Sequence, residues 1–96
     1  MTFTVKLSPV MVEQLNKLDE KSKKIISEKI KIIEENPFHF KKIHSKRFRK
    51  VFRIRLNLQG KEMRLIYVVF EPNIILACLL DRNKNYTDLE KYLNKI

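Results

Sequence analysis

The 96-residue sequence contains only one cysteine and one glycine, and each scarcity excludes a class of structural feature. A lone cysteine permits no internal disulfide, which suits a reducing compartment, and with only two histidines no metal-site spacing emerges. The single glycine excludes a glycine-rich phosphate loop and a flexible linker. The longest apolar run, Ile74–Leu80, is far too short to span a bilayer, and the N-terminus shows no secretory signal. We therefore expect a single cytoplasmic domain over residues 1–96, with no membrane, metal or cofactor.

Acidic residues are also scarce. The chain has 21 Lys+Arg against 11 Asp+Glu, a formal charge of +10, and no acid lies between Asn36 and Lys61. The basic residues of that segment are Lys41, Lys42, Lys46, Arg47, Arg49, Lys50, Arg53, Arg55 and Lys61. Such a charge attracts polyanions, so RNA, DNA, an acidic protein or a membrane surface are the candidate partners, and a merely solvated basic surface is the alternative.

The first half of the chain predicts a strand and two helices. Residues 3–7 alternate apolar and polar as a half-buried strand does. Ser8 and Pro9 then read as an N-cap followed by proline at the first helical position, and apolar residues continue at helical spacing to residue 18. A second helix is predicted over about 21–35, where Asn36-Pro37 ends it. Helices joined this tightly should pack as an antiparallel hairpin.

The second half changes to a period of two. In Val51–Leu58, Arg53 and Arg55 fall on the face opposite the apolar residues. A turn at 59–61 leads to a strand over 62–70, a second turn to a central strand over 74–80, and residues 86–96 form a short amphipathic helix. We therefore predict a two-layer α+β fold: an N-terminal strand, an antiparallel helical hairpin, a three-stranded antiparallel meander and a C-terminal helix. The hairpin covers one sheet face, and the arginines lie on the other, partly shielded by the last helix.

Several segments in this order resemble the RelE/ParE superfamily of type II toxins. The segments are Leu7-Ser8-Pro9, Glu34-Glu35-Asn36-Pro37, Phe52-Arg53-Ile54-Arg55-Leu56, Met63-Arg64-Leu65-Ile66-Tyr67 and Asp81-Arg82-Asn83-Lys84-Asn85-Tyr86. The resemblance covers nearly the whole chain. It implies a metal-free endoribonuclease, a messenger-RNA interferase that cuts in the ribosomal A site, inhibits translation and is held inactive by a cognate acidic antitoxin.

The resemblance also implies a set of site residues. The catalytic group would be Arg55, Arg64, Arg82 and Tyr86. Substrate binding would involve Arg53, Lys84, Lys46, Arg47, Arg49 and Lys50, with the basic loop before the strand Val51–Leu58 in contact with ribosomal RNA. The ParE branch, which inhibits DNA gyrase, generally lacks the full catalytic set. Its presence here favours the nuclease, and gyrase binding is the alternative.

The residues themselves suit part of this chemistry. When a 2′-hydroxyl attacks the adjacent phosphorus, charge grows on the non-bridging oxygens, and the planar forks of Arg55 and Arg64 can stabilise it. Arginine keeps its proton, so it is a poor general base. Tyr86 or Lys84 could accept the proton if nearby cations lower its pKa, and Tyr86 could instead stack on a base or pack the last helix.

Other groups are expected to be structural. Cys78 lies in an apolar run and is expected to pack in the core, and His39 and His44 are assigned no catalytic role. A non-catalytic double-stranded-RNA-binding module is a third reading of the same element order. Such a module usually needs a lysine cluster where its last helix begins, whereas Tyr86–Glu90 contains two acids.

Overall fold

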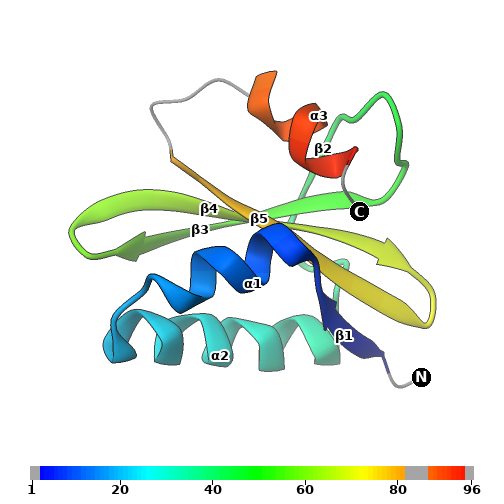
Figure 1. Cartoon of the computed structure of the whole chain (residues 1–96). Helices are drawn as coiled ribbons and strands as arrows, with labels where there is room; N and C mark the ends of the chain where they lie inside the picture. The colour runs from blue at the N-terminus through cyan, green and yellow to red at the C-terminus, as the bar shows by residue number, and fades with distance from the viewer. Residues whose placement is uncertain (1–2, 82–86, 95–96) are drawn as a thin grey trace.

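The protein folds around a twisted, mixed five-stranded sheet with helices on both faces (Figure 1). The computed structural model describes residues 3–81 and 87–94. Its elements are β1 (Thr4–Leu7), α1 (Pro9–Asn16), α2 (Glu20–Glu35), β2 (Lys41–Ile43), β3 (Val51–Leu58), β4 (Lys61–Phe70), β5 (Asn73–Asp81) and α3 (Thr87–Leu93). The strand order is β1-β5-β4-β3-β2, with β1 parallel to β5 and the other neighbours antiparallel. The predicted α+β class is confirmed.

The α1–α2 hairpin covers one sheet face, and α3 lies on the other (Figure 1). The predicted strands and helices are all present, and the structure adds β2, which lies in the segment expected to be a basic loop. Within residues 3–81 and 87–94, no helix has the length and apolarity needed to cross a membrane.

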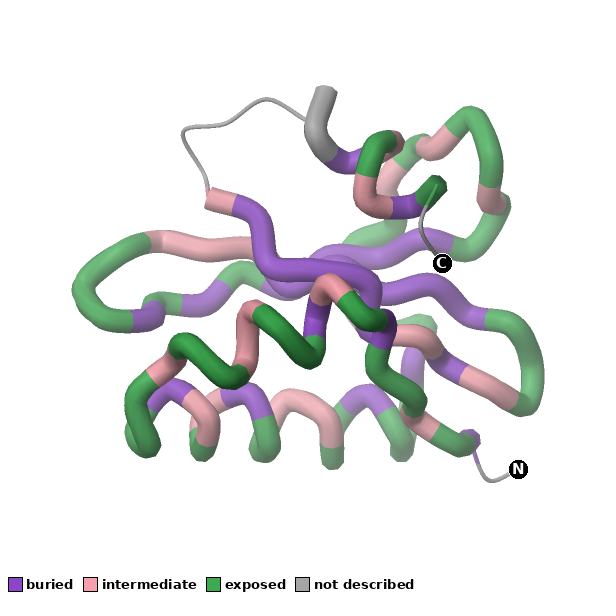
Figure 2. The backbone as a smooth tube through the Cα atoms, viewed as in Figure 1, coloured by how far each residue is buried: buried purple, intermediate pink, exposed green. Residues whose placement is uncertain are grey.

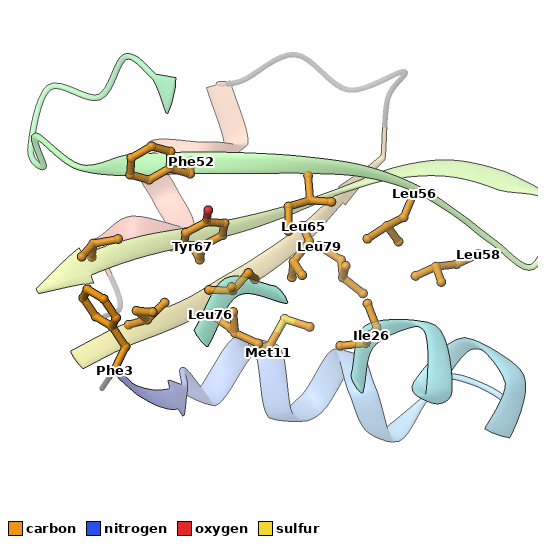
Figure 3. Close-up of a cluster of buried hydrophobic side chains, with 14 residues drawn as sticks. Phe3, Met11, Ile26, Phe52, Leu56, Leu58, Leu65, Tyr67, Leu76 and Leu79 are labelled. Atoms are coloured by element: carbon orange, nitrogen blue, oxygen red, sulfur yellow. The ribbon is translucent and has the colours of Figure 1, made fainter. Parts of the chain in front are cut away.

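The larger part of the core lies between the hairpin and the sheet. Figure 3 shows its inward-pointing side chains, and Figure 2 shows that burial concentrates along the central strands. Members of this cluster include Phe3, Met11, Ile26, Phe52, Leu56, Leu58, Leu65, Tyr67, Leu76 and Leu79. Tyr67 stacks on Phe52 with ring centroids 5.4 Å apart, and its hydroxyl donates to the Pro37 carbonyl at 2.5 Å. Burial raises the pKa of Tyr67, so the phenol remains a proton donor that anchors the loop after α2.

Helix α1 completes the hydrogen bonding of β5 where β1 ends. Strand β1 pairs with β5 only as far as Leu76, and a register shift in the β4–β5 ladder follows. The Ser8 hydroxyl donates to the Ala77 carbonyl (2.6 Å) and also accepts from the Met11 N–H as the N-cap of α1 (3.0 Å). Two residues further along β5, the Gln14 amide donates to the Leu79 carbonyl (2.9 Å) and accepts from its N–H (2.7 Å). These side chains therefore occupy the place of a neighbouring strand.

Helix α2 begins at an acidic cap. The Asp19 carboxylate accepts from the Ser22 N–H at 2.8 Å. The hydrogen bonds from the side chain and backbone of Ser22 lower the pKa of Asp19 below its ordinary value. The exposed cap therefore acts in its ionised form at neutral pH.

Candidate functional site

Arg55 of β3 and Arg64 of β4 lie directly opposite each other in the sheet. The register that pairs them is set by the β3–β4 turn, in which Gln59 and Gly60 both have positive φ (54° and 77°). Two such residues make the tight hairpin connection whose twist matches that of the strands. Leu58 consequently pairs with Lys61, and the same ladder brings Arg55 opposite Arg64.

Both arginines belong to the sheet face away from the α1–α2 hairpin. Their neighbours Ile54 and Leu65 point into the hairpin core, and successive residues of a strand point to opposite faces. The β3–β4 hairpin extends beyond α3, so α3 covers only part of this face (Figure 1). Arg55 is exposed, and Arg64 is half-buried and makes contacts within the protein. Side chains on directly opposed positions have Cβ atoms about 5 Å apart, so two guanidinium forks can reach one phosphate.

Arg53 does not share this exposure. The alternation of β3 places it on the same face as Arg55, as predicted, but only 8% of its surface is exposed, and it makes contacts within the protein. It lies between Lys41 of β2 and Ile66 of β4, its partners on either side. The expectation that Arg53 lies on an open surface is therefore wrong. The unpredicted strand β2 makes β3 an inner strand at this position, and Ile66 beside Arg53 belongs to the core cluster under α3.

The basic loop 44–50 is anchored to other parts of the fold. The Lys50 ammonium pairs with Glu71 at 2.9 Å and lies 5.6 Å from the centre of the Phe38 ring. Two contacts join the loop to α3 and the residue after it: the Lys46 N–H donates to Glu90 Oε1 at 3.1 Å, and the Arg47 guanidinium donates to the Asn94 side chain. Arg49 is exposed.

This loop is also distant from the arginine pair. Lys50 precedes Arg55 by five residues of extended chain, which span about 16 Å. The structure therefore does not bring Lys46, Arg47, Arg49 and Lys50 together with Arg55 and Arg64. The remaining predicted residues, Arg82, Lys84 and Tyr86, lie outside the described residues. Strand β5 ends just before them at Asp81, whose partner on β4 is Met63, the residue before Arg64.

A cavity at the outer edge of β3 combines residues named from the sequence with others that the sequence did not single out, above all Lys29 and Phe40. It has a volume of about 450 Å³ and is lined by Lys29, Phe40, Lys41, Arg53, Ile54 and Arg55, hereafter the β3-edge pocket. Four of these six side chains are cationic and none is acidic. Lys41 is one of the basic residues of the acid-free segment, whereas Lys29 comes from α2 and is brought here only by the tertiary fold.

The cysteine and one of the two histidines of the chain, His39, lie in structural contacts. Cys78 is fully buried, and burial raises the pKa of its thiol to about 12, so it is a core residue as expected. Within residues 3–81 and 87–94, no three His, Cys, Asp or Glu side chains gather as metal ligands would. The exposed His39 ring packs edge-to-face on Phe40, with centroids 5.2 Å apart.

Comparison with known proteins gives a structural match without a sequence match. No family model and no curated protein sequence matches the chain significantly. A double arginine-to-alanine mutant of the E. coli toxin RelE, in its free state, matches with a TM-score of 0.72 and 13% identity, covering 99% of this chain and 94% of that one. The chain has the RelE toxin fold.

Complexes show the same RelE fold. The intact E. coli RelBE toxin–antitoxin complex matches with a TM-score of 0.66 and 15% identity, covering 88% of this chain and all of that one. The archaeal RelE–RelB complex from Pyrococcus horikoshii OT3 matches with a TM-score of 0.63 and 23% identity, again covering 88% of this chain and all of that one. On this RelE fold, Arg64 pairs with Leu80, the residue before the last one of β5, so the Arg55–Arg64 pair lies beside the end of that strand.

Proposed function

We propose that the protein is the toxin of a toxin–antitoxin pair and a metal-free endoribonuclease that cleaves messenger RNA in the ribosomal A site. The observation that carries this proposal is the Arg55–Arg64 pair, two cations held face to face by strand register beside the end of β5. The RelE fold and the net charge of +10 support it.

In the proposed reaction, the 2′-oxygen loses its proton and attacks the adjacent phosphorus. The bond from phosphorus to the 5′-oxygen breaks, leaving a 2′,3′-cyclic phosphate and a 5′-hydroxyl that takes up a proton. Arg55 and Arg64 bind the non-bridging oxygens, where negative charge increases in the transition state. Arginine does not serve as the base, so proton transfer is assigned to the segment after β5, with Tyr86 or Lys84 as acceptor and Arg82 as a further phosphate ligand.

A cognate acidic antitoxin is the proposed partner. The chain carries ten more basic than acidic residues, and an acidic segment over the Arg55–Arg64 face would neutralise it and exclude RNA at the same time. Two structures with this fold are toxin–antitoxin complexes of RelE with RelB.

The test is 5′-end mapping of cellular RNA after a brief induction. Wild type should generate new ends within translated codons and arrest growth. Arg55→Ala or Arg64→Ala should reduce cleavage roughly 10²–10³-fold, as loss of one preorganised donor does, and Arg55→Lys should lose much of the activity because it keeps the charge but not the fork. Lys31→Ala, which removes one exposed cation from α2, is the matched control and should cleave normally.

Two results would contradict the proposal. If the Arg55→Ala/Arg64→Ala double variant still produces the new ends, these residues are not the catalytic pair. If wild type arrests growth with intact messages but with DNA damage and filamentation, the toxin acts on gyrase instead.

A further inference from the structure

The β3-edge pocket continues the cationic surface of the Arg55–Arg64 pair around the edge of the sheet. Arg55 belongs to both, because it faces Arg64 across the ladder and also lines the pocket. Lys29 lies on α2, beneath the opposite sheet face. The pocket therefore connects the face that carries the arginine pair with the α2 side of the molecule.

The edge of β3 is open at this point. Strand β2 pairs with β3 only over Val51–Arg53, and its first residue, Lys41, is the partner of Arg53. Among the described residues, the part of β3 from Ile54 to Leu58 pairs with β4 alone, and the pocket lies where this unpaired edge begins, at Ile54 and Arg55.

The lining chemistry suits an anion with an attached apolar ring. Arg53 is engaged within the protein, so the cations that remain to meet a ligand are Lys29, Lys41 and Arg55. Like charges gathered around one cavity repel one another, and a bound anion relieves that repulsion. The half-buried Phe40 supplies apolar surface beside them, and combining cations with an aromatic ring is how proteins hold single-stranded nucleic acid.

We infer that the β3-edge pocket binds the nucleotide next to the scissile phosphate, with Lys29 and Lys41 as ligands of its phosphate and Phe40 against its base. The inference rests on the proposed function, because it takes the Arg55–Arg64 pair as the position of the cleaved phosphodiester. It gives the RNA strand a path across β3 at Arg55 and around the sheet edge toward α2. That strand is the message, and a contact with ribosomal RNA instead is the contrary outcome that the ribosome experiment below detects.

The test measures RNA binding without cleavage. The probe is a fluorescein-labelled RNA hexamer with 2′-O-methyl groups, which lacks the attacking hydroxyl. Its anisotropy is titrated at several salt concentrations between about 50 and 200 mM, because the slope of log affinity against log salt counts the phosphates neutralised. The variants are Lys29→Ala, Lys41→Ala and Phe40→Leu. The matched control is again Lys31→Ala, which removes the same charge from the same helix two residues away, on the other side of α2.

Lys29→Ala and Lys41→Ala should each weaken binding about two- to fivefold at low salt and reduce the slope by about 0.7. Phe40→Leu should weaken binding without changing the slope, because it removes a ring and no charge. Lys31→Ala should keep the wild-type slope. If Lys29→Ala keeps that slope too, with an unchanged thermal unfolding curve, the pocket does not hold a phosphate and the inference is overturned.

Two further arms identify the RNA and separate this inference from the proposed function. Binding is compared on vacant ribosomes and on ribosomes carrying a message: a Lys29→Ala defect confined to the latter assigns the pocket to the message, and an equal defect on both assigns it to ribosomal RNA. The first result supports the inference, and the second overturns it, because the pocket would then hold a phosphate of another strand. If Arg64→Ala abolishes cleavage while Lys29→Ala binds as wild type, only the inference fails. If wild type cleaves nothing while hexamer binding depends on Lys29, only the proposed function fails.

Discussion

Replacing Arg55 by glutamine removes one of two cations that strand register holds directly opposite each other. Arg55 is exposed and makes no ion pair with any described residue, so its loss should remove a repulsion without breaking a contact. Like charges on directly opposed positions of an antiparallel pair destabilise a sheet. We therefore expect Arg55→Gln to be more stable than wild type, although the proposed function makes it inactive.

The size of the gain follows from the geometry. Two unit charges about 6 Å apart in water repel by about 0.7 kcal/mol, and screening at 0.15 M salt, where the Debye length is about 8 Å, roughly halves this. The expected gain of about 0.3–0.7 kcal/mol agrees with the 0.2–1 kcal/mol range typical of cross-strand pairs. For a domain of this size, it raises the melting temperature by about 1–5 °C. At 1 M salt the Debye length is about 3 Å, and the gain should fall to about 0.1 kcal/mol.

The assay is thermal and urea unfolding of wild type, Arg55→Gln, Arg64→Gln and the double variant at low and high salt. Arg64 makes contacts within the protein, so its own substitution is expected to destabilise. The double-mutant cycle removes that effect and isolates the coupling between the two cations. A destabilised Arg55→Gln, or a gain that persists unchanged at 1 M salt, would refute the argument from opposed charges.

Two further predictions concern the supports of the fold. Gln14→Leu should lower the free energy of unfolding by about 1–3 kcal/mol in urea titrations, because both backbone groups of Leu79 lose their partner. Gln14→Glu should have a stability between that of Gln14→Leu and wild type, since a carboxylate still accepts the N–H of Leu79. Equal losses in the two variants would count against the paired hydrogen bonds. For Asp19, hydrogen bonding lowers the folded-state pKa, so its contribution is present above the unfolded value near 3.8 and is lost as the pH falls through the folded pKa. Acid titration of unfolding should therefore show a smaller loss for Asp19→Asn than for wild type, and parallel curves would contradict the cap assignment.

The parts of the fold that the sequence predicts are those with a local cause. The N-cap and proline at residues 8–9 begin α1, and the turn at Gln59-Gly60 fixes the ladder that opposes Arg55 to Arg64. Each depends on residues within a few positions of one another, where propensity and turn geometry act. The period of two in β3 likewise placed Arg55 on the correct face.

The parts that were missed depend on residues far apart in the chain. Strand β2 is three residues long and reads Lys-Lys-Ile, which is too short to show a period, and it makes β3 an inner strand at the buried Arg53. The pairing of Lys50 with Glu71 joins positions 21 residues apart and removes a cation from the predicted RNA surface. Lys29 likewise lines the pocket only because the tertiary fold places α2 next to residues that lie far from it in the sequence.

These differences narrow the predicted basic face to a smaller and more specific surface. Of the cations in the acid-free segment, some hold the fold together: Arg47 binds the residue after α3, Lys50 binds the β4–β5 turn, and Arg53 is buried. Arg55 is set apart because its exposed guanidinium has another cation directly across the ladder. Like charges on opposed positions add a repulsion to the sheet, and a bound anion would relieve it. Under the proposed function, that anion is the phosphate of the RNA.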